Sequence, residues 1–90
     1  MYVNEFDWDE ANRQHIARHH VGPDEVEESL VSGRPHIRRT AQERYLAYGQ
    51  SESGRYLYIV FMVKKAGFIR IITARDMTAR EKRFYRGRRK

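Results

Sequence analysis

The chain has 90 residues, of which 40% are hydrophobic, 12% aromatic and 33% charged, and its formal net charge is +6. This length and composition predict a single folded domain, 1–90, with a modest core, and they exclude a disordered chain or two independent cores. The chain has no cysteine, which excludes disulfides and thiolate metal sites and is typical of a reducing compartment, so we expect a cytoplasmic protein.

The first 33 residues are predicted to form a short strand and two helices. The acidic start has no apolar signal-peptide segment, and “VNEFDW” (3–8) favours a strand. Asp9 can cap a helix over 10–20, because its carboxylate accepts hydrogen bonds from the free N–H groups of the first turn. “VGPDEVEESLVSG” (21–33) predicts a second helix with a proline in its first turn and Gly33 as a left-handed cap.

From residue 35 the hydrophobic pattern alternates, which is typical of strands. Strands are predicted around 36–39, in “ERYLAYG” (43–49), in “RYLYIVFMVK” (55–64) and in “GFIRIITAR” (67–75). The last three follow one another through short turns and should form an antiparallel meander. Both faces of 55–64 are apolar, so we expect this strand to be central and covered on both sides. Its apolar run is too short to cross a membrane, and no membrane association is expected.

The C-terminal segment predicts a third helix. Thr78 and Glu81 have the spacing of a capping box, which starts a helix near Ala79, and Gly87 would end it. We expect 86–90 to form a flexible basic tail. The element order predicts an α+β fold, in which an antiparallel meander sheet packs with two N-terminal helices and one C-terminal helix.

The charge is divided unevenly along the chain. Residues 1–33 hold two Lys/Arg against eight Asp/Glu, a net charge of −6, whereas residues 34–90 hold sixteen against four, a net charge of +12. Such a basic segment favours a polyanionic partner, most simply nucleic acid, because each neutralised phosphate releases counterions. The alternative is an ordinary soluble protein with a basic surface.

Two arginines in the last strand are the strongest candidates for a site. Arg70 lies within an apolar run, and a buried guanidinium without a partner is costly, so it must be ion-paired, at an edge or open to a cleft. A salt bridge to Glu43 or Glu81 is the structural alternative. Arg75 is five residues after Arg70, so on a regular strand the two side chains point to opposite faces of the sheet. They share a site only if the strand ends or bulges before Arg75.

Other residues supply the remaining parts of a metal-free RNA-cleaving site. Arg44 and Lys64 stand at strand ends, and Glu81 and Tyr85 share one face of the last helix. Such a site needs a base for the ribose 2′-hydroxyl, cations for the charge of the phosphorane and an acid for the leaving oxygen.

Two further patterns favour structural roles. His15 and His19 have the i, i+4 spacing of a metal pair but no third ligand is evident, so we predict no metal and no cofactor. Phe6 and Trp8 are expected in the core. The predicted sheet carries four tyrosines, Tyr45, Tyr48, Tyr56 and Tyr58. They either stack nucleobases or pack under the helices, and we favour packing.

Three segments carry a family resemblance: “FDWDEANRQHIARHHVGPDEVEESL” (6–30), “ERYLAYGQSESGRYLYIVF” (43–61) and “IRIITARDMTAREKRFY” (69–85). In order, they resemble three parts of the BrnT toxins. The first is an F-x-W-D start that leads through an R/K-H-G-V turn to an acidic second helix. The second is an E-R-Y/F strand with its hairpin, and the third is an I-R-I-I-S-A-R signature followed by T-x-x-E-R. In this chain His20 stands where the family usually has glycine, and Thr73 replaces a common serine.

The resemblance implies a RelE-like ribonuclease fold and the toxin half of a bacterial type II toxin–antitoxin pair. Such a toxin cleaves RNA without a metal and inhibits translation. A BrnA-type antitoxin neutralises it, and the toxin contacts operator DNA only through that antitoxin. By motif, Arg70 and Arg75 match the signature arginines and Arg44 follows the strand-opening Glu43. His19 matches the turn histidine. The closing helix matches at Glu81, Arg83 and Tyr85.

We therefore expect a metal-independent endoribonuclease. The expected catalytic residues are Arg70, Arg75, Arg44, Lys64, Glu43 and Tyr85. The expected RNA-binding residues are Arg38, Arg39, Lys65, Arg80 and Arg83. The alternative is a non-catalytic module whose basic face binds nucleic acid or an acidic protein segment.

Overall fold

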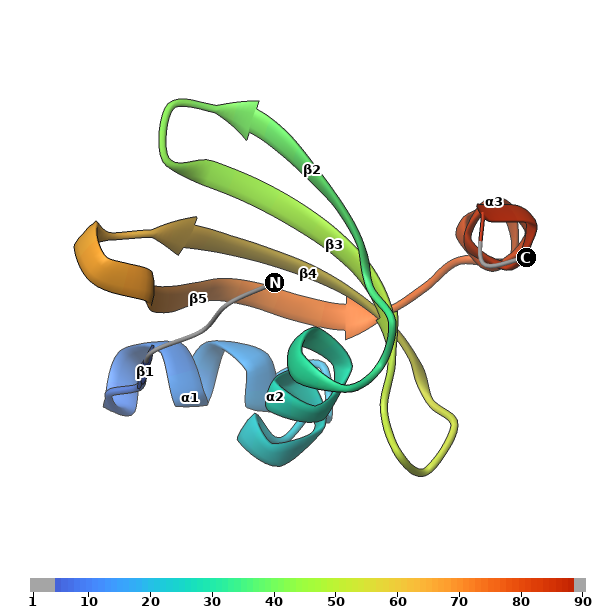
Figure 1. Ribbon diagram of the computed structural model, residues 1–90. Coiled ribbons are helices and arrows are strands. Elements are labelled where there is room, and N and C mark those ends of the chain that lie inside the picture. The colour runs from blue at the N-terminus through green and yellow to red at the C-terminus, as the bar shows by residue number, and fades with distance from the viewer. Residues whose placement is uncertain (1–4, 89–90) are drawn as a thin grey trace.

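Five strands form one twisted sheet in the computed structural model, which describes residues 5–88 (Figure 1). In sheet order β1-β5-β4-β3-β2, the strands are β1 (Glu5–Asp7), β5 (Phe68–Asp76), β4 (Tyr56–Val63), β3 (Arg44–Gln50) and β2 (His36–Ala41). Strands β2 to β5 pair antiparallel, whereas β1 pairs parallel with β5. The predicted α+β class is confirmed, but the sheet is mixed, because the intervening chain returns β5 alongside β1 in the same direction.

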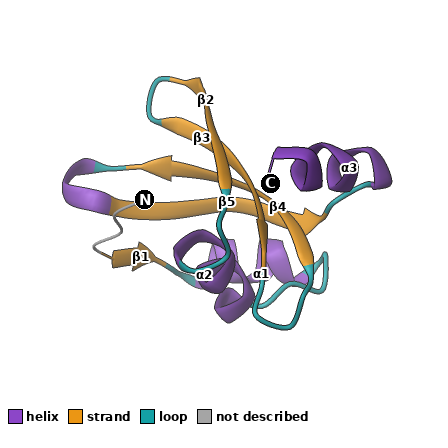
Figure 2. Ribbon diagram, turned by 45° about the vertical axis from the view of Figure 1, so that its right-hand side comes forward, coloured by secondary structure: helices purple, strands orange, loops and turns teal. Residues whose placement is uncertain are grey.

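Two of the three α-helices within residues 5–88 cover one face of the sheet. Helices α1 (Glu10–Ala17) and α2 (Pro23–Val31) lie below the strands in Figure 1, and α3 (Ala79–Arg88) stands beyond the end of β5. Figure 2 shows α3 on the opposite side of the sheet from α1 and α2. No helix within residues 5–88 is long and apolar enough to cross a membrane.

The core lies between the sheet and helices α1 and α2. Its fully buried side chains come alternately from the strands and from one face of each helix: Ile16, Val26, Leu30, Leu57, Ile59, Phe61, Ile69 and Ile71. Phe6 and Trp8 pack against this cluster, as predicted. The central position of β4 is confirmed, but its second face is only half-buried, because α3 reaches one end of the sheet and covers little of it.

The first helix begins as predicted and ends earlier. Asp9 caps it, since the Asp9 carboxylate accepts a hydrogen bond from the Asn12 N–H at 3.0 Å and the Asn12 side chain accepts one from the Asp9 N–H at 2.8 Å. Helix α1 stops at Ala17 rather than residue 20, because His20 has a φ of 60°, in the left-handed region that glycine favours. The turn therefore keeps a glycine-like conformation with a histidine in it.

Gly33 is required by close packing and not by a left-handed cap. Ser32, with a right-handed backbone, ends α2, and the positive φ of 50° falls on Arg34. A Cβ on Gly33 would lie 2.2 Å from the Gln50 carbonyl oxygen and 2.8 Å from that of Ser29, closer than atoms can approach. The predicted cap was wrong because glycine is needed here to avoid a clash with the backbone of β3, and the local sequence does not show that contact.

The C-terminal helix starts at its predicted capping box. The Thr78 N–H donates to Glu81 at 2.9 Å and the Glu81 N–H donates to the Thr78 hydroxyl at 3.2 Å. The helix continues through Gly87 to Arg88, so residues 86–88 are helical and not a flexible tail. The tail prediction for 89–90, and the strand prediction for residues 3 and 4, fall outside the described residues.

Candidate functional site

The sheet face opposite α1 and α2, here the open face, carries four of the predicted site residues in three rows that cross the strands. The strand register places four residues in each row. The aromatic row is His36, Tyr48, Tyr58 and Arg75; the apolar row is Arg38, Leu46, Val60 and Thr73; the arginine row is Arg44, Met62, Arg70 and Asp7. Arginines thus surround a half-buried apolar centre.

A β-bulge puts the two signature arginines on the same face. The partners of two consecutive residues of β4 are two positions apart in β5, which leaves Ile72 as the extra residue of the bulge. Ile71 before the bulge and Ala74 after it both point into the core. Arg70 and Arg75 therefore both point to the open face. The strand bulges before Arg75, which is the condition under which the two arginines can share a face.

Arg75 forms a bidentate ion pair with Glu81 at the start of α3. Its two terminal nitrogens lie 2.8 and 3.0 Å from the Glu81 carboxylate oxygens, and the guanidinium lies 4.0 Å from the centre of the Tyr58 ring. The hydrogen bond from Arg75 lowers the pKa of Glu81, and the capping N–H of Thr78 acts in the same direction. Glu81 is therefore a carboxylate at neutral pH.

A cleft of about 310 Å³ opens beside this pair, between α3 and the open face. It is lined by Arg38, Tyr48, Arg80, Glu81 and Phe84, and we call it the α3 cleft. It brings together two predicted RNA-binding arginines and the carboxylate that holds Arg75. Within residues 5–88, neither Arg38 nor Arg80 has a carboxylate partner, so the cleft carries uncompensated positive charge.

Arg70 is ion-paired, which is one of the three possibilities that its place in the strand left open, but its partners are not Glu43 or Glu81. Its guanidinium lies 3.0 Å from the Asp9 carboxylate and 3.6 Å from that of Asp7, and Lys64 lies 3.2 Å from Asp7. The Asp9 contact raises the pKa of Arg70. Two cations and two carboxylates cancel here. A hollow of about 360 Å³ beside them is lined in part by Lys65.

The remaining predicted residues are dispersed. Glu43 and Arg44 are exposed at the turn between β2 and β3, where Glu43 has a φ of 63° and its carbonyl accepts from the Val63 N–H. Arg39 and Arg83 are exposed, on β2 and α3 respectively. Predicted catalytic residues therefore do not converge on one point.

Tyr85, predicted to be catalytic, is completely buried. Its hydroxyl lies 2.8 Å from the Gly33 carbonyl oxygen and 3.0 Å from that of Arg34, so it attaches α3 to the segment between α2 and β2. A phenol in this position has an anchoring role and does not face the open cleft.

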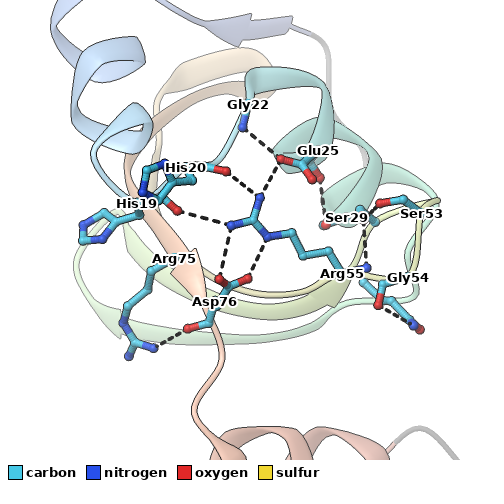
Figure 3. Close-up of polar contacts among 12 residues, drawn as sticks. His19, His20, Gly22, Glu25, Ser29, Ser53, Gly54, Arg55, Arg75 and Asp76 are labelled. Carbon is cyan, nitrogen blue, oxygen red and sulfur yellow. Dashed lines mark hydrogen bonds and ion pairs between the residues drawn. The ribbon is translucent and has the colours of Figure 1, made fainter.

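Arg55 is a central residue that sequence reasoning missed. It pairs with Asp76 at 2.7 and 3.2 Å and with Glu25 at 3.0 Å, and it donates to the carbonyls of His20 at 2.6 Å and His19 at 3.2 Å (Figure 3). It thus ties the end of α1, the start of α2 and the end of β5 together, next to Arg75. Its only sequence signal is its place after the “SESG” turn, which is too weak to single it out.

His36 is a second residue that the predictions left aside. Its ring stacks on Tyr48 at 6.2 Å and meets the Phe84 ring edge-on at 5.3 Å. Burial lowers the pKa of His36, and nearby Arg88 and Arg38 lower it further, so the imidazole is neutral at pH 7. The His15 and His19 rings lie 6.1 Å apart, and no group of three potential metal ligands occurs among the described residues.

The comparisons with known proteins agree on one family. A family model described as the ribonuclease toxin BrnT of type II toxin–antitoxin systems matches residues 8–81. The crystal structure of the Brucella abortus ribonuclease toxin BrnT superimposes with a TM-score of 0.67 at 22% identity, over 82% of this chain and 96% of that one. No curated protein sequence matches. Since the family model spans most of the chain, this protein belongs to the BrnT family of type II toxin–antitoxin ribonuclease toxins.

Proposed function

We propose that this chain is a metal-independent endoribonuclease that cuts RNA at the edge of the α3 cleft and so inhibits translation. The observation that carries the proposal is the Arg75–Glu81 pair, which places a carboxylate base and a guanidinium beside two arginines without carboxylate partners among the described residues. Family membership supports ribonuclease chemistry, and the shared BrnT fold agrees with it.

The chemistry uses the two members of the pair in different roles. Glu81 accepts the proton of a ribose 2′-hydroxyl, and the 2′-oxygen attacks the adjacent phosphorus. Arg75 donates hydrogen bonds to the phosphorane oxygens as negative charge accumulates on them. The bond from phosphorus to the 5′-oxygen breaks, that oxygen takes a proton from water as it leaves, and the products are a 2′,3′-cyclic phosphate and a 5′-hydroxyl. Glu81 returns its proton to solvent. Because guanidinium has five N–H donors, Arg75 can contact phosphate and Glu81 together.

The other predicted residues have supporting roles in this scheme. The distance between the aromatic row and the arginine row follows from Tyr58 and Met62, which are four residues apart on β4, or about 13 Å at about 3.3 Å per residue. A single phosphate therefore cannot contact both rows. Arg44 and Arg70 therefore contact the RNA farther along the strand, as do Lys64 and Lys65. Arg38 and Arg80 hold the phosphates next to the reaction centre, with Arg39 and Arg83 at its margins. Glu43 directly precedes Arg44, at the end of the sheet away from Arg75, and Tyr85 is completely buried, so we assign neither to proton transfer at Arg75.

The partners follow from the same proposal. A type II toxin has a protein antitoxin, and we propose a BrnA-type antitoxin whose acidic segment covers the basic open face and whose DNA-binding domain brings the complex to operator DNA. The toxin works on RNA in the cytoplasm, through a RelE-like arrangement of sheet and C-terminal helix.

Cleavage of a synthetic single-stranded RNA by purified protein in excess EDTA tests the proposal. Wild-type protein should yield 2′,3′-cyclic phosphate ends, and both Arg75→Ala and Glu81→Gln should slow cleavage by at least about 100-fold. Arg13→Ala is the matched control, because Arg13 is exposed on α1, away from the open face. Folded Arg75→Ala protein that cleaves RNA and arrests growth as the wild type does would refute the assignment.

A non-catalytic binding module is the rival function. It is favoured by one observation: Arg70 and Arg75 already have carboxylate partners, as purely structural arginines would. RNA that stays intact in the same assay but shifts in a salt-dependent way on a gel would support this rival.

A further inference from the structure

Phe84 on α3 is an aromatic ring that is held in place and yet exposed. It is 38% exposed, and within residues 5–88 the only other exposed large hydrophobic side chain is Val31 on α2. Its ring meets His36 edge-on at 5.3 Å and 68°, and Tyr48 edge-on at 5.2 Å and 61°. Two edge contacts fix the ring plane, so Phe84 pays little entropy to stack on a ligand.

The surroundings of Phe84 are cationic and not apolar. Arg38 and Arg80 line the α3 cleft with it, and the Arg88 guanidinium lies 5.9 Å from its ring centre. His36 adds no charge, because burial and the neighbouring arginines lower its pKa. A flat apolar surface among cations matches a nucleotide, which has a flat base and an anionic phosphate.

We propose that the α3 cleft is a subsite for one unpaired nucleobase, which stacks on Phe84 while Arg38 and Arg80 contact the phosphates of the same nucleotide. The inference rests on the proposed function, since it places this base next to the phosphate cut at Arg75. The cleft volume of about 310 Å³ is at the lower end of the range for small-ligand sites and suits a single base. Bases in a duplex have both faces covered by stacking, so the subsite selects single-stranded RNA.

The test measures coupling between Phe84 and one base. A fluorescein-labelled 2′-O-methyl RNA octamer, which cannot be cleaved, is titrated by anisotropy, together with octamers that each have one abasic position. An abasic nucleotide at one position should weaken wild-type binding about 10-fold, within the ~1–3 kcal/mol that stacking on one base contributes. Phe84→Ala should weaken binding of the intact octamer by a similar factor and show no further loss at that position.

Two variants keep the result interpretable. Phe84→Trp should retain the coupling, whereas Phe84→Leu, which keeps an apolar side chain without a ring, should lose it. Val31→Ala, at the other exposed hydrophobic, should bind all octamers as the wild type does. Circular dichroism confirms that each variant is folded.

Three results would overturn the subsite. The first is equal tolerance of abasic nucleotides at every position, and the second is an abasic penalty that persists in Phe84→Ala. The third is unchanged RNA binding together with weakened antitoxin binding in Phe84→Ala, which would make the cleft a protein-docking site. Cleavage assays separate the two proposals. If every abasic octamer binds equally and RNA is cleaved normally, only the subsite is refuted. If Phe84 is coupled to one base but no RNA is cleaved, the ribonuclease mechanism is refuted and the subsite is supported.

Discussion

Replacing Arg55 with alanine should destabilise this domain more than any other single change of a surface charge. The side chain is 24% exposed and makes five hydrogen bonds, to two carboxylates and two carbonyl oxygens, in three separate parts of the chain. Its removal frees the last carbonyls of the α1 turn and leaves Glu25 and Asp76 without their cation.

The size of the effect follows from exposure. Each bond from the charged guanidinium to the carbonyls of His19 and His20 contributes about 1 kcal/mol after solvent competition. The Glu25 pair, at 24% and 29% exposure, adds about 0.5–1 kcal/mol, and the Asp76 pair adds less, about 0.5 kcal/mol, because Asp76 is 62% exposed. We expect a loss of about 3 kcal/mol in the free energy of unfolding, or about 10–20 °C in Tm for a domain of this size.

Urea unfolding followed by Trp8 fluorescence measures this loss, because Trp8 is the single tryptophan and packs against the core. Arg55→Lys keeps the charge but cannot bond two carboxylates and two carbonyls in a planar fork, so it should recover less than half of the loss. Arg13→Ala should be neutral within about 0.5 kcal/mol. A loss below 1 kcal/mol in Arg55→Ala would mean that solvent replaces the network and that our reasoning about Arg55 is wrong.

Three further predictions concern the backbone and pH. Gly33→Ala should destabilise the protein by at least about 2 kcal/mol by urea unfolding, because its Cβ would overlap the β3 backbone, whereas Gly87→Ala, with no atom within 4 Å, should stabilise it by about 0.5–1 kcal/mol. His20→Gly should raise Tm, since the φ of 60° at this position suits glycine better than any side chain. Hydrogen bonds from Arg55 lower the pKa of Asp76 below its ordinary 3.8, so their stabilisation is complete above that pH and is lost as the pH falls through the lower folded value. Urea midpoints between pH 6 and 2.5 should fall more steeply below about pH 4 in the wild type than in Arg55→Ala.

Local signals in the sequence were sufficient for most element boundaries. The Asp9 cap and the Thr78–Glu81 capping box act between residues three apart, so the sequence shows both partners at once. Alternation located β3, β4 and β5 within about two residues. Two glycine predictions were wrong. Gly33 is required by its close contact with the β3 backbone, which the local sequence does not show. Helix α3 continues past Gly87 because a helix can include an exposed glycine at modest cost.

The candidate site was predictable in its residue types and not in its grouping. Arg75 and Glu81 are six residues apart and were both named, but a bulge at Ile72 decides that Arg75 shares a face with Arg70. Nothing in the local sequence marks that bulge. Arg55 was missed for the same reason, because its partners are 21 to 36 residues away and each of them looks like an ordinary surface residue.

The uneven charge of the sequence has a structural counterpart that bears on where RNA binds. Four of the six ion pairs within residues 5–88 join a carboxylate from the acidic first third to a cation from the basic remainder. These carboxylates neutralise Arg55, Lys64 and Arg70, at the β1 edge and on the α1–α2 side of the sheet. None of the four reaches the α3 cleft, where Arg38 and Arg80 stay uncompensated. Intramolecular pairing therefore leaves positive charge uncompensated at the α3 end of the open face, where an RNA phosphate gains by binding.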